Sequence, residues 1–178
     1  RDLHLSLRRQ RQMCIRDSLN TGNAISLTAR GEDGSVTSIA AEDAIALAAL
    51  TTGTITLDND SGTFPTLVGS AADVATIYSS TQFHANGKSS SNVTISDAAG
   101  SILQAADLHT IVDGTDKLVT ITNAATVTIS GKAADITAVY AEAANSTTAA
   151  HNKISNLLAT DVIITDLEVA AGTLEALV

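Results

Sequence analysis

The chain has 178 residues, a length typical of one domain, and 44% of them are apolar, too many for a disordered acidic tail. Aromatic residues make up 2%, whereas Ala and Thr number 30 and 24, so we expect a thin core of Val, Ile, Leu and Ala. The net charge of −9 argues against nucleic acid or an anionic membrane as a partner. No apolar run approaches the ~20 residues of a membrane-spanning helix, so membrane insertion is not expected.

Residues 1–18 differ from the rest of the chain in composition. They hold five of the ten basic residues and the only Met and Cys, Met13 and Cys14, whereas residues 19–178 have 17 acidic and five basic residues. The string RQMCIRDS resembles the peptide obtained when sequencing-adapter DNA is translated at the edge of a metagenomic contig. We therefore predict an artefactual or disordered segment at 1–18, the alternative being an Arg-rich targeting segment. Residues 19–178 lack cysteine, which excludes disulfides, thiolate metal sites and cysteine nucleophiles from them.

Two kinds of segment alternate along residues 19–178. Strands are predicted where Val, Ile or Leu alternates with Ser or Thr, and short helices where apolar residues recur at i, i+3 and i+4. In chain order these are strand 24–28, an ambiguous helix copy at 41–47, strand 54–57, helix motif 69–78, strand 93–96, helix motif 104–112, strands 119–122 and 127–130, helix motif 131–140, strand 162–165 and a degraded helix motif at 170–178.

The helix motifs indicate an internal repeat. Residues 69–78 (GSAADVATIY) match residues 131–140 (GKAADITAVY) at an offset of 62, and Gly, Ala-Ala-Asp and Tyr coincide. A fixed period of this kind is typical of a solenoid or array. We expect one array over 19–178, about five half-repeats truncated at both ends, in which neighbouring repeats are the partners of each unit.

Strand alternation predicts how the layers are arranged. Strands joined by helices are expected to be parallel, and parallel strands covered on both faces are almost continuously hydrophobic. Because these strands keep Ser or Thr at every second position, one face of the sheet is expected to be wet. The favoured fold is α/β, a solenoid of stacked strand–short-helix repeats with a parallel sheet, and an all-β parallel β-helix is the alternative. Ser70 with Asp73 predicts a helix start, and Gly114 a helix C-cap.

The wet face carries a ladder of hydroxyl groups as the candidate binding site. Regular Thr-x-Thr arrays on flat solenoids resemble those of ice-binding proteins, although Thr also suits the solvent side of any strand. With a strand spacing of ~4.8 Å, the ladder is expected to form regular rows. Its members are Thr54, Thr56, Thr94, Ser96, Thr120, Thr122, Thr128 and Ser130.

Other candidate sites are sparse. Asp58 and Asp60 precede Gly62 in an acidic turn that resembles half of a calcium loop, but an EF-hand would need Glu at position 69, which is Gly. His84, His109 and His151 lack a second ligand at metal-site spacing, and no nucleophile–base arrangement or phosphate-binding loop is present in the sequence. We therefore expect no catalytic activity and no cofactor, with calcium as the one ion to test.

The Ala-Ala-Asp units resemble the tandem Ala/Thr/Asp-rich repeats of very large surface or secreted proteins of marine picocyanobacteria. The resemblance covers residues 24–178 and is closest in the two Tyr-bearing copies. It implies an exported repeat segment that acts as a spacer, coat or adhesive stalk, at the cell surface or outside the cell, in contact with the envelope or external surfaces. An array that binds ice or mineral, or a calcium-stiffened adhesin, is the alternative.

Overall fold

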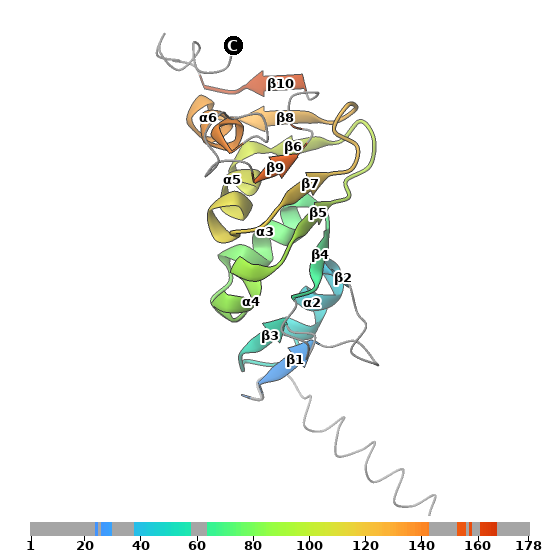
Figure 1. The fold of residues 1–178 in the computed structure, drawn as a ribbon, viewed down its shortest axis with the longest axis vertical. Helices are drawn as coiled ribbons and strands as arrows, with labels where there is room; N and C mark the ends of the chain where they lie inside the picture. The colour runs from blue at the N-terminus through green and yellow to red at the C-terminus, as the bar shows by residue number, and fades with distance from the viewer. Residues whose placement is uncertain are drawn as a thin grey trace, which may run out of the picture.

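The computed structural model describes residues 24, 26–29, 38–57, 64–142, 153–155, 157 and 161–166. They form a mixed α/β fold in which all strand pairs are parallel and the helices are short. In this described part of the chain no sheet closes into a barrel. The elements are arranged along the long axis of the molecule, with β1 at one end and β10 at the other (Figure 1).

Each helix of eight or more residues follows two short strands, whereas one strand per helix was expected. In chain order the elements are β1 (Leu27–Ala29), β2 (Ser38–Ala40), α2 (Ala41–Ala48), β3 (Ile55–Leu57), β4 (Thr66–Gly69), α3 (Ala71–Ser79), α4 (Ala85–Ser90), β5 (Val93–Ile95), β6 (Ile102–Gln104), α5 (Ala105–Gly114), β7 (Val119–Ile121), β8 (Thr128–Gly131), α6 (Ala133–Ala141), β9 (Ile154–Ser155) and β10 (Asp161–Ile164). The strands β2, β4, β6 and β9 were not predicted, because each has only two to four residues and shows little alternation.

The strands form three sheets, with the orders β1-β3, β2-β4-β5-β7-β9 and β10-β8-β6. The strand before α3, β4, pairs with the strand before α2, but its other neighbour is β5, which does not precede a helix. The strand before α5, β6, instead begins the three-stranded sheet. Phe83 forms an isolated bridge with Ile55 of β3. The strands that directly precede α3 and α5 therefore belong to two different sheets.

The helices pack in a row, α2 on α3, α3 on α5 and α5 on α6. The short helix α4 follows α3 in a segment for which the sequence predicted no helix. Gly87 lies where this helix meets β3, because a Cβ there would come within 2.9 Å of the Leu57 carbonyl oxygen. A side chain at 87 would separate the two elements.

The predicted alternation of the strands is confirmed. In the five-stranded sheet one row of residues in register points into the core and is fully buried, formed by Leu67, Val93, Val119 and Ile154. The next row lies on the opposite face and is half-buried, formed by Val68, Thr94, Thr120 and Ser155. One face is therefore closed by side chains and the other meets water.

The predicted role of Gly114 as a helix C-cap needs correction. Gly114 is the last residue of α5 and does not adopt a left-handed cap, since Gly100, with φ 82°, is the positive-φ glycine among the described residues. A Cβ at Gly114 would instead collide with the Tyr78 ring. In the Ala-Ala pairs that begin α3 and α5, the first alanine is buried and the second is exposed, because only the first faces the sheet.

Candidate functional site

The structure brings together only part of the predicted hydroxyl ladder. Thr94 and Thr120 lie in register on β5 and β7, and Ser155 of β9 extends their row. The Ser155 hydroxyl donates to the Val119 carbonyl at 3.4 Å and lies 3.3 Å from the Thr120 hydroxyl. These three residues form what we call the hydroxyl row, and all three are half-buried.

The remaining ladder residues lie elsewhere. Thr56 belongs to β3 in the two-stranded sheet, and Thr128 and Ser130 belong to β8 in the three-stranded sheet. The other three are exposed and lie just outside strands, namely Thr54, Ser96 and Thr122. The expectation of one continuous ladder is wrong, because strands with the same Thr pattern belong to three different sheets.

The metal candidates gain no geometric support. Asp58, Asp60 and His151 lie outside the described residues, and His84 is exposed at the start of α4. Within the described residues, no group of three or more His, Cys, Asp or Glu side chains could hold a metal ion.

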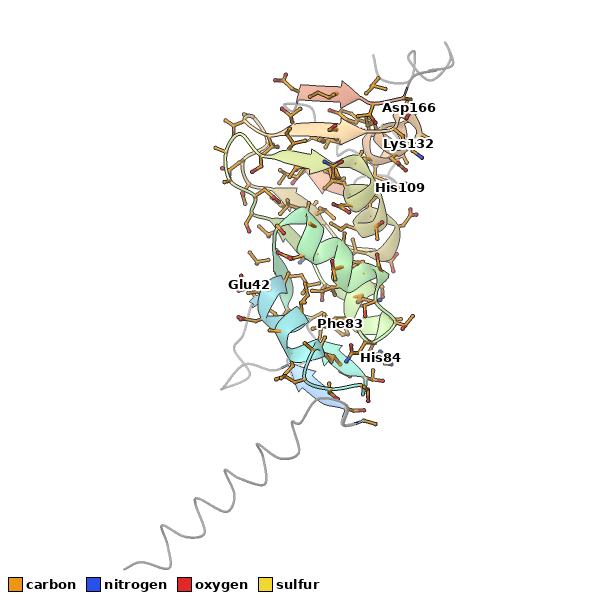
Figure 2. All side chains as sticks on the ribbon, turned by 180° about the vertical axis from the view of Figure 1, so that it is seen from behind. Glu42, Phe83, His84, His109, Lys132 and Asp166 are labelled. Carbon is orange, nitrogen blue, oxygen red and sulfur yellow. The ribbon has the colours of Figure 1, made fainter. Side chains whose placement is uncertain are left out.

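Two aspartates that sequence reasoning missed connect a helix to the strand segment that follows it. Asp97 lies two residues after β5, and its Oδ2 accepts from the backbone N–H of Ala71, the first residue of α3, at 2.8 Å. In α6 the matching N–H of Ala133 donates to Asp166 Oδ2 at 3.0 Å, two residues after β10. Asp166 lies beside Lys132 at this helix start (Figure 2). Each carboxylate satisfies a free N–H and the positive end of a helix dipole.

The start of α3 has a second cap, and this one was predicted. Ser70 Oγ accepts from the Asp73 N–H at 3.1 Å and donates to Asp73 Oδ2 at 2.6 Å. Burial raises the pKa of Asp107, and the negative charge of Asp97 raises it further. Carboxylates therefore lie near the N-terminal ends of α3 and α5.

A cation caps the other end of α3. Lys88 Nζ donates to the carbonyls of Tyr78 at 3.0 Å and Ser80 at 2.7 Å, and the Tyr78 hydroxyl donates to the Lys88 carbonyl at 2.9 Å. Burial raises the pKa of Tyr78 to about 12, which a hydrogen bond with the Thr115 side chain partly offsets. Burial lowers the pKa of Lys88. These reciprocal bonds fasten α4 to α3.

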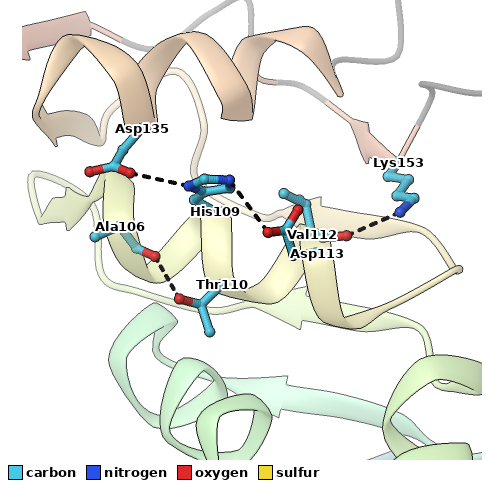
Figure 3. A network of polar contacts seen from close by, with 7 residues as sticks. All are labelled: Ala106, His109, Thr110, Val112, Asp113, Asp135 and Lys153. Carbon is cyan, nitrogen blue, oxygen red and sulfur yellow. Dashed lines mark hydrogen bonds and ion pairs between the residues drawn. The ribbon is translucent and has the colours of Figure 1, made fainter.

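A histidine lies between α5 and α6 (Figure 3). His109 Nδ1 lies 3.1 Å from Asp135 Oδ1 on α6, and its Nε2 lies 3.5 Å from Asp113 Oδ2 one helical turn further along α5. Lys153 Nζ donates to the Val112 carbonyl at 3.1 Å, close to the end of α5. The sequence analysis did not find this pair, since Asp135 lies 26 residues from His109.

Several of these polar groups bond one element to another. Asp97 and Asp166 accept from helix starts, Lys88 and Lys153 donate to carbonyls near helix ends, and Ser155 donates to the neighbouring strand. No helix in the described part of the chain has the length and apolar character needed to cross a bilayer. Comparison of the chain with protein-family models, curated proteins and solved structures finds no match.

Proposed function

We propose that this chain is a segment of a solenoid that acts as a spacer, coat or adhesive stalk in a large protein at the cell surface or outside the cell. The observation that carries the proposal is that equivalent contacts recur in two copies of the repeat, in which Gly69 and Gly131 are 62 residues apart, as are Ala71 and Ala133. Gly69 lies against Ala41, and Gly131 lies against Ala105 in the same way. The helix caps made by Asp97 and Asp166 recur likewise.

Recurring contacts between neighbours are the physical basis of an array. In a solenoid each unit contacts only the next, so stability is a sum of unit and interface terms. Here the helices pack in sequence order, and the aspartate caps connect α3 and α6 to following strand segments. Such a design gives length, which is what a spacer or stalk needs.

Composition supports a place outside the cell. Residues 19–178 carry a net charge of −12, from five basic and 17 acidic residues, and they contain no cysteine. A high charge of one sign keeps an extended protein soluble and separate from its copies. The resemblance to repeats of giant surface or secreted proteins points the same way.

The proposal is tested by long-read sequencing through both ends of the gene. We expect the reading frame to continue through many further Ala-Ala-Asp units and to include an export signal. A frame that closes after a few units beside a catalytic domain would overturn the spacer role and make this segment an accessory module.

Native-state hydrogen exchange tests the array itself. Ile136→Ala empties a fully buried position of α6 and is expected to increase exchange in α6 and α5 while leaving α2 and β4 protected. The matched variant Val74→Ala, in α3, should move the effect toward α2. Equal loss of protection across all helices in both variants would show one cooperative globular unit instead.

The hydroxyl row favours a second candidate, a surface that binds ice or mineral. Thr94 and Thr120 lie in register, and their spacing is that of neighbouring parallel strands. Ice crystals grown with the purified chain should then be shaped, and Thr94→Val with Thr120→Val should abolish the shaping. Unshaped crystals with the wild-type chain would exclude this candidate for ice.

A further inference from the structure

We propose that His109 is a pH-sensitive clasp that holds α5 to α6 more tightly when its imidazole is protonated. The inference concerns the packing of two helices and does not depend on the proposed surface role. It rests on the two carboxylates that face the two ring nitrogens. Asp135 Oδ1 lies 3.1 Å from Nδ1, and Asp113 Oδ2 lies 3.5 Å from Nε2.

The arrangement fits the imidazolium better than the neutral ring. An ionised carboxylate accepts hydrogen bonds and cannot donate them, and a neutral imidazole has only one N–H. In the neutral form one ring nitrogen therefore turns a lone pair toward a carboxylate oxygen. The imidazolium donates from both nitrogens and also attracts both negative charges. The exposed fraction is 35% for the His109 side chain, 26% for Asp135 and 75% for Asp113, so water screens the contact with Asp113 more than the contact with Asp135.

The other charged groups around the clasp do not replace this contact. The one charged residue of α3 is Asp73, which is bonded to Ser70, and β6 and β8 have none. Lys132 precedes α6, and Lys153 is bonded to a carbonyl at the end of α5. Within the described residues, Asp135 is therefore the charged group on α6 that His109 contacts directly.

The sign of the pH effect follows from this geometry. Because the imidazolium can donate to both carboxylates and the neutral ring to only one, the contact weakens as the pH rises through the range in which imidazole loses its proton. The clasp is therefore closed in mildly acidic solution and weakened above neutrality.

The test compares urea unfolding of the whole chain at pH 6 and pH 8. The variants are His109→Gln, Asp135→Asn and the double variant, and glutamine at 109 keeps a donor but cannot be charged. We expect His109→Gln to lower the folding equilibrium constant about two- to fivefold more at pH 6 than at pH 8. His84→Gln, at an exposed histidine, is the matched control and should show no such difference.

The double variant separates the clasp from a general effect of histidine. We expect coupling between positions 109 and 135 at pH 6 that is largely lost at pH 8. Equal coupling at both pH values, or a pH dependence that His109→Gln leaves unchanged, would overturn the proposal. A variant that fails to fold at 109 is replaced by Asp135→Asn alone, whose cost must then be larger at pH 6 than at pH 8.

Discussion

Replacing Gly131 with alanine tests a close approach between a strand and the preceding helix. Gly131 ends β8, and a Cβ there would lie 2.8 Å from the Ala105 Cβ and 3.4 Å from the Ala105 nitrogen. Ordinary contact between such atoms begins at 3.4 Å, so β8 and α5 must separate by several tenths of an ångström. Overpacking of this kind costs about 1–3 kcal/mol. We therefore expect Gly131→Ala to lower Tm by about 4–8 °C, as a cost of ~2 kcal/mol implies for a chain of this size.

A second substitution identifies the contact responsible. Ala105→Gly removes the methyl group that the new Cβ meets, at a cost of its own of about 1 kcal/mol. Combined with Gly131→Ala it should recover about 1–2 kcal/mol relative to the sum of the two single changes. Ala106→Gly, at the exposed neighbour on the same helix, should recover nothing. Additive costs in the first pair, measured by urea unfolding, would refute the contact between residues 26 positions apart.

Three further substitutions probe other contacts. Asp97→Ala removes the acceptor for the Ala71 N–H and should cost about 0.5–2 kcal/mol in urea unfolding, whereas Asp97→Asn, which keeps an acceptor, should cost less. Because the pKa of Tyr78 is raised to about 12, the unfolded chain loses the phenol proton first, so stability should fall as the pH rises from 10 to 12, and Tyr78→Phe should flatten that fall. Ile136→Asp buries an unpaired carboxylate and should cost about 4 kcal/mol or more, and an unmoved circular-dichroism melt would contradict its place in the core.

Local patterns in the sequence were sufficient to predict much of the fold. The strands Val93–Ile95 and Val119–Ile121 were found because Val and Ile alternate with Thr over several residues. The cap formed by Ser70 and Asp73 was found because both partners lie within one turn. The strand Ile102–Gln104 was missed, since it is three residues long and runs directly into a helix.

Contacts between distant residues could not be predicted in the same way. Asp97 and Ala71 are 26 residues apart, as are His109 and Asp135, and their meeting depends on the lengths of the intervening turns. The hydroxyl ladder failed for the same reason. The Thr pattern shows which face of a strand is wet, but it carries no information about which strand lies next to it.

The side chains on the two faces of the five-stranded sheet bear on the choice between a spacer and a surface-binding array. A flat binding surface requires side chains of the same chemical kind in each strand of its outer face. Along the five-stranded sheet the outer row changes midway from apolar to hydroxyl residues, in the order Ala40, Val68, Thr94, Thr120 and Ser155. The inner row keeps its apolar character throughout, in the order Ile39, Leu67, Val93, Val119 and Ile154.

This difference between the two rows has a physical meaning. A spacer needs only the inner row to be uniform, because stacking depends on buried apolar contact and places no demand on the side that meets water. A binder of ice or mineral needs the outer row to be uniform as well. The outer row is uniform over β5, β7 and β9 but not over β2 and β4, where Ala and Val take the place of Thr. The sheet therefore meets the requirement of a spacer over its whole width and that of a binding surface over part of it.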